Sequence, residues 1–238
     1  MEIIFGKNAV LSFLQANQVL EIYVENHFKD ASFLAKLKEY KVKVYEKNKS
    51  FLDDLTQNAR HQGVVAKIKD FVYAPYQETI EKIKKMNNPT LLMIDGIEDP
   101  HNLGAIIRTV EAFHVEGIII KKHHQAPINA TVAKVSTGAI ANVKIMQVTN
   151  LTQTLIDLKE KGFWIVAAEA YQGVDYQTMD YQMPLVLVVG SEGFGISRLV
   201  KEQADFNVFI PMQGKVNSLN VSVATAILLA HIQTHKGQ

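Results

Sequence analysis

The spacing of hydrophobic residues in the first part of the chain alternates between two periods. Helical spacing occurs around Ala9–Leu14, Phe33–Leu37 and Phe51–Leu55, whereas short strand-like runs occur at 22–24 and 63–68. The run 42–45 alternates apolar and polar side chains, which is typical of a half-buried strand. This alternation predicts a compact α/β module over residues 1–70.

The later part of the chain contains longer and more continuous apolar runs. A charged helical stretch within residues 71–88 is predicted to be a linker, and residues 89–238 a second domain. Apolar runs predict strands at 91–95, 117–120, 143–146, 163–168, 185–189 and 208–210. Helical patterns separate most of them, notably 103–113, 151–161 and 197–204. Buried strands alternating with helices predict a mostly parallel sheet with helices on both faces, and ligands bind such sheets beyond the carboxyl ends of the strands.

Three polar loops follow predicted strands, and the first spans residues 95–109. Asn102 is placed to cap a helix, and Arg108 follows Gly104 by one helical turn. The neighbours of Arg108 are apolar, so its stem is expected to be partly buried, where an unpaired charge would be costly.

The second loop, residues 190–197, is rich in glycine, and the third lies within residues 210–229. Glycines allow a sharp turn and a close approach to a ligand. In the third loop, Pro211 ends a strand, and Ser218 or Asn220 can cap a helix with an apolar face at Val221, Ala224 and Leu228. The free N–H groups of its first turn can hold a polar ligand, although a capped core helix explains the same residues.

The sequence does not match the common glycine-rich and catalytic motifs. The order Gly190-x-x-Gly-x-Gly differs from the dinucleotide fingerprint, and Gly214-Lys215 is followed by Val216 rather than the Ser or Thr of a phosphate-binding loop. A G-x-S-x-G elbow and a His/Asp/Glu cluster with metal-ligand spacing are both missing, so no metal is expected.

Charge, cysteine content and the lack of long apolar runs limit the classes of binding partner and the cellular location that we expect. The net charge is +1, so binding to RNA would depend on local patches, either the lysines between Lys36 and Lys49 or the stretch 60–62. A lysine-rich helix is more often only a solvated face. Cysteine is absent, there is no apolar run of about 18 residues, and the N-terminus lacks signal-peptide features. We expect a cytoplasmic protein without membrane partners.

Together, the three loops resemble the motifs of the SpoU (TrmH-type) RNA ribose 2′-O-methyltransferases, within the SPOUT class. The matching stretches are NLGAIIRT at 102–109, LVVGSEGFGIS at 187–197, IPMQG at 210–214 and SLNVSVA at 218–224. The stretches GKNAV at 6–10 and HQGV at 61–64 resemble the RlmB branch, whose first domain is a ribosomal-protein-like RNA-binding module.

This resemblance implies a trefoil-knotted C-terminal domain, S-adenosylmethionine as cofactor, a homodimer that shares its active sites, and a guanosine in large-subunit (23S) ribosomal RNA as target. By matched position it implies two sets of site residues. The cofactor-binding set is Gly190, Ile210, Met212, Gly214 and Leu219. The catalytic and substrate-positioning set is Asn102, Arg108, Glu192, Ser218 and Asn220.

Chemistry suggests roles for two of these residues. A guanidinium group is hardly ever deprotonated in proteins, so Arg108 is expected to fix a phosphate and stabilise the ribose oxyanion rather than act as a base. Glu192 is expected to orient neighbouring groups. The alternatives are a tRNA substrate, a non-catalytic RNA-binding protein of ribosome assembly and, more distantly, a nucleotide-binding oxidoreductase.

Overall fold

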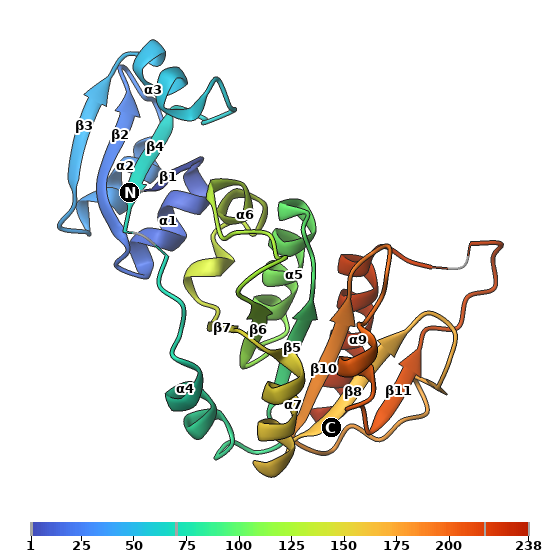
Figure 1. The fold of residues 1–238 in the computed structure, drawn as a ribbon. Helices are drawn as coiled ribbons and strands as arrows, with labels where there is room; N and C mark the ends of the chain where they lie inside the picture. The colour runs from blue at the N-terminus through green and yellow to red at the C-terminus, as the bar shows by residue number, and fades with distance from the viewer. Residues whose placement is uncertain (1, 70, 217, 238) are drawn as a thin grey trace. The chain divides into compact units, whose positions relative to one another are not determined.

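A computed structural model describes residues 2–69, 71–216 and 218–237. The chain divides into two compact units (Figure 1): unit 1 comprises Met1–Val72 and Ile128–Asn142, and unit 2 comprises Tyr73–Pro127 and Val143–Gln238. Unit 1 thus includes a segment that the sequence-based division assigns to the second domain. Where independently folding domains begin and end stays a prediction.

Unit 1 is a four-stranded sheet with helices. Its strands are β1 (Glu2–Phe5), β2 (Val19–Glu25), β3 (Lys43–Lys47) and β4 (Val64–Ile68), in the order β1-β4-β2-β3. β4 is antiparallel to both of its neighbours, whereas β3 is parallel to β2 and lies at an edge. The helices are α1 (Lys7–Gln15), α2 (Ala31–Lys38), α3 (Lys49–Thr56), α6 (Ala130–Val135) and the short η1 (Ala139–Ala141).

Two predictions for unit 1 were wrong. All five residues of β3 are exposed rather than half-buried, because the strand lies at the sheet edge. His61, predicted as part of a basic patch, is buried: its Nε2 lies 3.0 Å from Asp53 Oδ1, and its Nδ1 accepts a hydrogen bond from the Gly63 N–H. His61 therefore holds the turn before β4. β1 was not predicted at all.

Unit 2 is built on a seven-stranded sheet whose paired strands are all parallel, in the order β7-β6-β5-β10-β8-β11-β9. The strands are β5 (Thr90–Asp95), β6 (Gly117–Lys121), β7 (Ile145–Val148), β8 (Trp164–Glu169), β9 (Val174–Asp175), β10 (Leu185–Gly190) and β11 (Phe206–Phe209). The six predicted strands are confirmed, and the two-residue β9 is additional. The predicted α/β class with a parallel sheet is confirmed.

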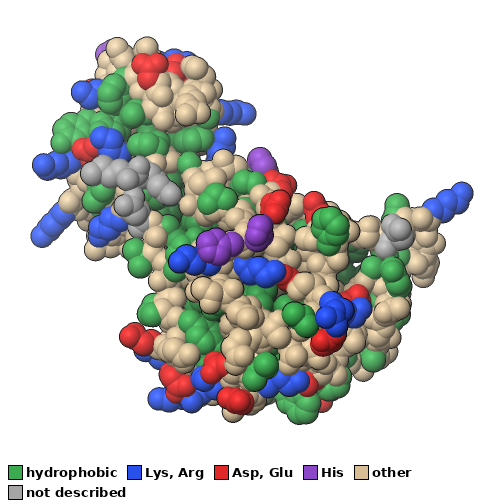
Figure 2. Space-filling view, viewed as in Figure 1, with side chains coloured by type: hydrophobic (Ala, Val, Ile, Leu, Met, Phe, Trp, Pro, Cys, Tyr) green, Lys and Arg blue, Asp and Glu red, His purple; other side chains and the backbone are tan. Residues whose placement is uncertain are grey.

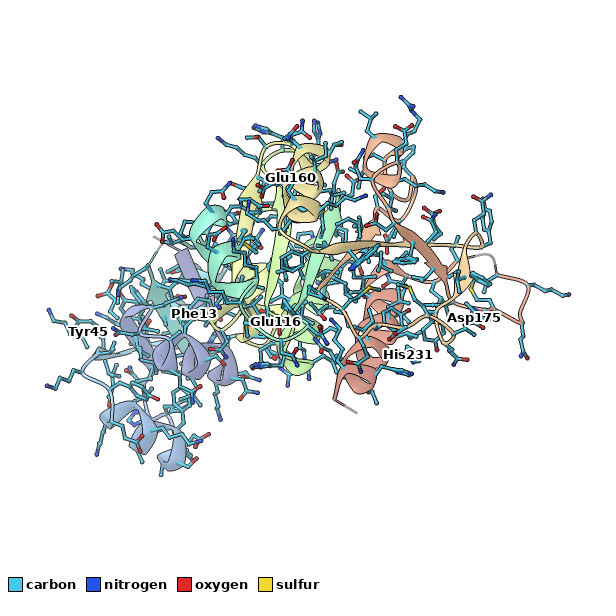
Figure 3. The ribbon with its side chains drawn as sticks, turned by 90° about the horizontal axis from the view of Figure 1, so that it is seen from below. Phe13, Tyr45, Glu116, Glu160, Asp175 and His231 are labelled. Atoms are coloured by element: carbon cyan, nitrogen blue, oxygen red, sulfur yellow. The ribbon has the colours of Figure 1, made fainter. Side chains whose placement is uncertain are left out.

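Helices cover both faces of this sheet (Figures 1 and 3). They are α4 (Tyr76–Ile83), α5 (Pro100–Ala112), α7 (Leu151–Glu160), α8 (Arg198–Lys201) and α9 (Val221–Lys236). On one face α4 and α7 pack on Leu91 and Met93 of β5, with Ile80 and Ile83 of α4 fully buried. On the other face α5 packs against α9. The segment predicted as a linker therefore contributes to the core of unit 2.

The centre of this sheet is where the chain changes direction. From β5 the chain proceeds outward through β6 and β7, whereas β8, β10, β11 and β9 lie on the other side of β5. Gly190 at the end of β10 pairs in register with Asp95 at the end of β5. Loops that leave adjacent strands on opposite sides form a crevice at such a switch point, which is the usual ligand site of parallel sheets. Within the described residues, no helix is long and apolar enough to cross a membrane.

Candidate functional site

The loop after β10, residues 190–197, is a tight turn closed by its own backbone. Ser191 and Gly195 exchange two backbone hydrogen bonds of 3.1 and 3.0 Å, and Gly195 has a positive φ of 66°. A Cβ atom built on Gly190 would lie 2.0 Å from the carbonyl carbon of Gly195. Because this neighbour is backbone and cannot move aside alone, the turn requires glycine at position 190.

Asp95 anchors the far end of this loop. Its side chain is almost fully buried, accepts a 2.8 Å hydrogen bond from the Ser197 N–H and forms an ion pair with Lys121 at the end of β6. Burial alone would raise the pKa of Asp95, but Lys121 and Ser197 outweigh it, so that the pKa lies below its ordinary value. The carboxylate thus ties the ends of β5 and β6 to the loop that follows β10.

We expect Asp95→Asn to destabilise the protein by about 1–3 kcal/mol at pH 7, because the ion pair with Lys121 is lost in a buried position. Since the pKa of Asp95 is depressed in the folded state, its contribution is present above about pH 4 and disappears as the pH falls through the folded-state value. Urea unfolding of wild type and variant between pH 7 and pH 3 measures this difference.

Lys121→Met tests the same ion pair from its other side, and Lys122→Met, at an exposed neighbour, is the control. An Asp95→Asn variant as stable as wild type at pH 7, or a stability difference that stays constant down to pH 3, contradicts this role.

Three side chains from three distant loops meet beside the anchored turn, and we call Asn102, Glu192 and Asn220 the amide–carboxylate triad. Glu192 Oε1 accepts hydrogen bonds from Asn102 Nδ2 at 2.9 Å and from Asn220 Nδ2 at 2.5 Å. Asn220 Nδ2 also donates to Asn102 Oδ1 at 3.0 Å. The three loops predicted to carry the chemistry therefore converge through direct contacts.

The N-terminus of α9 determines how the Asn220 side chain is oriented. Its Oδ1 accepts hydrogen bonds from the backbone N–H groups of Ser222 and Val223, which confirms one of the two predicted caps. With its oxygen engaged by the helix, the amide nitrogen faces Glu192. The cap of α9 is thus also a member of the triad.

Asn102 does not cap α5, contrary to the prediction. The N-cap is Asp99, whose carboxylate accepts a 2.9 Å hydrogen bond from the His101 N–H, and Pro100 occupies the first turn. Asn102 lies inside that turn and is buried, so its amide points into the triad instead of bonding the helix backbone.

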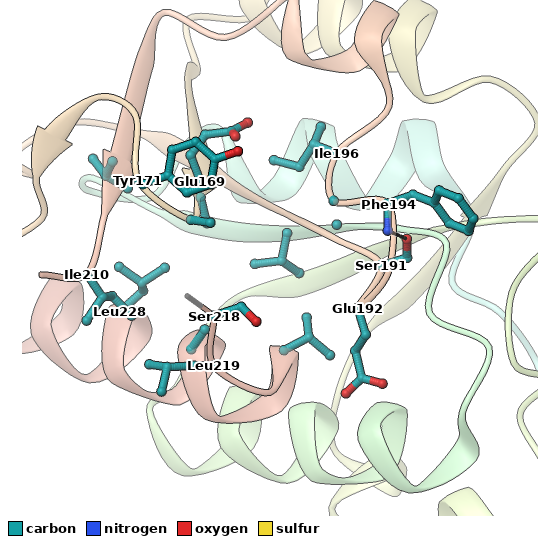
Figure 4. Close-up of a pocket in the computed structure, with 18 of the residues that line it drawn as sticks. Glu169, Tyr171, Ser191, Glu192, Phe194, Ile196, Ile210, Ser218, Leu219 and Leu228 are labelled. Carbon is teal, nitrogen blue, oxygen red and sulfur yellow. Dashed lines mark hydrogen bonds between the residues drawn. The ribbon is translucent and has the colours of Figure 1, made fainter. Parts of the chain in front are cut away.

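A pocket of about 390 Å³ opens between the 190–197 loop and the segment before α9 (Figure 4). In this view Tyr171 lies at the upper left of the pocket and Glu192 at its lower right. Most of the predicted site residues line it: Gly190, Glu192, Ile210, Met212, Ser218 and Leu219. Gly214 is not among its lining residues.

A second pocket of about 280 Å³ shares the stretch 191–194 with the first. Its other lining residues include Glu98, Asp99, Asn102 and His124. Glu192 thus borders both pockets. Two compartments with a carboxylate between them can hold two reactants side by side, which is the arrangement a transfer reaction requires.

Arg108, Gly214 and Asn220 line neither pocket, but Asn220 belongs to the triad, whereas Arg108 lies away from it. Arg108 is exposed on α5, six residues beyond Asn102 and so about 9 Å further along the helix. Arg108 follows exposed His101 by seven residues and shares its solvent-facing side, and the expectation of a partly buried stem stays a prediction. Among the described residues, none forms a hydrogen bond or ion pair with it.

Sequence reasoning missed Asp95 and Glu169 as parts of this site. Asp95 anchors the loop, and Glu169 lines the first pocket and pairs with Lys201 at 3.0 Å. Each is the last residue of a buried strand, so an acidic residue that ends an apolar run was the available signal. No group of three His, Cys, Asp or Glu residues in the described chain could hold a metal ion.

Comparison with known proteins gives matches over nearly the whole chain. The sequence model of the SpoU rRNA Methylase family matches residues 89–230, and a model described as RNA 2′-O ribose methyltransferase substrate binding matches residues 3–74. A Staphylococcus haemolyticus protein, named as a TrmH family tRNA/rRNA methyltransferase, is 43% identical over 99% of this chain and 96% of its own.

Solved structures of methyltransferases are similar to this chain over almost its whole length. An AdoMet-bound rRNA methyltransferase from Sinorhizobium meliloti has a TM-score of 0.81 at 26% identity, covering 98% of this chain and 87% of that one. The SpoU methyltransferase AviRb from Streptomyces viridochromogenes has a TM-score of 0.83 at 18% identity, covering 99% and 89%, and at that identity the likeness concerns the fold.

Proposed function

Because this chain belongs to the SpoU rRNA methylase family, we propose that it transfers a methyl group from S-adenosylmethionine to the ribose 2′-hydroxyl of a guanosine in large-subunit ribosomal RNA. Methyl transfer to RNA is the activity of the family. The observation that carries the proposal is the amide–carboxylate triad, which joins the three matched motifs between two adjoining pockets.

The first pocket suits S-adenosylmethionine. Its volume of about 390 Å³ is in the range of small-ligand sites, and Ile210, Leu219 and Leu228 supply apolar walls for a flat adenine ring. The backbone around Gly190 can bond its polar groups, and Met212 lies in the same wall. When bound, this cofactor supplies a methyl group already activated by a positively charged sulfur.

The second pocket is the natural place for the target ribose, since it shares Glu192 and Asn102 with the catalytic centre. A ribose hydroxyl is a weak nucleophile at neutral pH, so catalysis needs in-line positioning and stabilisation of the developing oxyanion. Glu192 holds both Asn side chains through one oxygen and so orients their N–H groups. Ser218, in the wall of the first pocket, can hydrogen-bond the reactants from the cofactor side.

Arg108 would act from a second copy of the chain. Its side chain is free in its own subunit, and a guanidinium group remains protonated, so it can bind the target phosphate and stabilise the oxyanion while phosphate or water accepts the proton. Exposed apolar residues gather on the elements around the first pocket, namely Phe194, Leu199, Leu219 and Val223. Exposed apolar side chains on the elements beside the pocket support our proposal of a homodimer with shared sites.

The ribosomal substrate is favoured by the module matched at residues 3–74, although relatives carry names that include tRNA. We expect 2′-O-methylguanosine to form when the enzyme and S-adenosylmethionine are incubated with unmodified bacterial 23S rRNA, supplied as transcripts and as immature large-subunit particles. Digestion to nucleosides and mass spectrometry identify the product, with tRNA transcripts in parallel. If the product forms only in tRNA, tRNA is the substrate instead. If a nucleoside other than guanosine is methylated, the proposed target base is wrong. If no 2′-O-methylnucleoside forms in any RNA, the proposed function is refuted.

A further inference from the structure

The edge strand of unit 1 presents two different faces. Side chains alternate along a strand, so Lys43, Tyr45 and Lys47 share one face of β3 while Val44 and Glu46 point to the other. Tyr45 pairs in register with Tyr23 on the neighbouring β2. The first face therefore places an aromatic ring between two lysines.

Tyr45 is the outer member of a stacked aromatic set. Its ring lies 5.8 Å from the ring of Tyr23 at an interplanar angle of 26°, and Phe51 of α3 contacts Tyr23 edge-on at 5.2 Å. Tyr23 is buried, whereas Tyr45 remains 38% exposed at the outer edge of the unit (Figure 3). The inner rings thus hold Tyr45 in a fixed orientation while part of it stays open to a ligand.

Positive charge surrounds this ring. Residues 36–49 contain six lysines and two glutamates, and Figure 2 shows Lys and Arg side chains projecting from the part of unit 1 that carries β3 in Figure 1. Lys47 lies 5.3 Å from the Phe51 ring centroid and Lys67 lies 5.3 Å from that of Tyr23. Lys67 also pairs with Glu21, which lies in register with Lys43, and Glu25 lies in register with Lys47; within the described chain Lys43 and Lys47 have no carboxylate within ion-pair distance.

We propose that this surface, which we call the β3 face (Lys43, Tyr45, Lys47 and Lys67), binds an unpaired stretch of RNA by stacking a base on Tyr45. Aromatic side chains flanked by cations suit single strands, because every base has a stackable face and the phosphates need positive charge. The excess of six lysines over two glutamates in residues 36–49 favours a polyanion over a protein partner. The inference rests on RNA being the substrate, and it places a substrate contact outside both pockets.

The test measures the affinity of the full chain for a fluorescein-labelled oligouridine, an unstructured probe, by anisotropy. Stacking contributes about 1–3 kcal/mol per base, so we expect Tyr45→Ala to weaken binding about tenfold and Tyr45→Phe, which keeps the ring, to bind like wild type. Val44→Ala is the matched control, because Val44 is adjacent, similarly exposed at 41% and on the opposite face. Lys47→Gln should lower the slope of log affinity against log salt concentration by about the amount that one phosphate contact contributes.

Wild-type affinity in Tyr45→Ala, or an equal loss in Val44→Ala, overturns the proposal. Crosslinking of wild-type protein to a 4-thiouridine oligonucleotide covers the case of a misfolded variant: a crosslink within residues 43–47 supports the β3 face, and crosslinks found only elsewhere refute it. Oligouridine binding that depends on Tyr45 in a protein without methyl-transfer activity would refute the proposed function and leave this surface standing.

Discussion

Combining two inactive variants, Arg108→Ala and Glu192→Ala, is expected to restore about a quarter of the wild-type methyl-transfer rate. In a two-fold dimer, half of randomly assembled pairs are mixed, and each mixed pair has one complete site if Arg108 serves the pocket of the other subunit. The structural reason is that Arg108 is exposed and lines neither pocket of its own chain, whereas Glu192 borders both.

Each variant alone should lose about 10²–10³ in rate, as removal of a group that stabilises an oxyanion does. Glu192→Gln keeps an oxygen that can accept both Asn N–H groups, so it should retain most activity if Glu192 orients rather than accepts the proton. Arg108→Lys should remain poor, because lysine lacks the planar fork that binds phosphate bidentately.

The mixture is made by co-expressing two differently tagged chains, purifying the mixed species through both tags and measuring methyl transfer to RNA. A purified mixed dimer should then have about half the wild-type rate, since one of its two sites is complete. A mixed dimer no more active than either variant would place Arg108 in its own subunit's site or outside catalysis. A chain that elutes as a monomer at assay concentration would rule out shared sites.

Gly190→Ala is expected to weaken S-adenosylmethionine binding about 100-fold, and with it methyl transfer. The added Cβ would lie 2.0 Å from the backbone of Gly195, so the 190–197 turn must open. Overpacking of this kind costs about 1–3 kcal/mol even where a structure can adjust. Here the adjustment would move the pocket wall and Glu192 together.

Gly193→Ala is the matched control in the same loop, because a Cβ at Gly193 meets no atom within 4 Å. Calorimetric titration of S-adenosylmethionine into both variants measures the effect, with thermal unfolding to check that each remains folded. Wild-type affinity in a folded Gly190→Ala variant would show that the turn around Gly190 is not part of the cofactor site.

The sequence was sufficient to predict those parts of the site whose structure depends on residues close together in the chain. Continuous apolar runs identified β5 and β10, and polar residues before an apolar helical pattern gave Asn220 as one of two candidate caps of α9. Both features depend on neighbours in sequence, so the pattern carries them.

The sequence-based predictions failed where the structure depends on contacts between distant residues or on the residue at which a helix begins. α5 begins at the cap Asp99 rather than at Asn102, so Asn102 lies within the first turn on the buried side of the helix, whereas Arg108 lies on its exposed side. The alternation in 42–45 is the same for a covered strand and for an edge strand, so the exposure of β3 was not readable. Segment 128–142 packs with unit 1 through contacts such as that of Ser12 Oγ with Thr137 O at 3.4 Å, which no local pattern reports; the domain boundaries themselves stay a prediction.

We propose that three strand-end loops together hold a methyl donor beside the triad. A crystal structure of the protein with S-adenosylhomocysteine, the demethylated product, is the decisive test. We expect this molecule to lie between the 190–197 loop and residues 210–219, in contact with Gly190, Ile210 and Leu219, with Asn102, Glu192 and Asn220 still hydrogen-bonded at one end of its pocket. The molecule bound elsewhere on the chain, with this pocket empty, would contradict it.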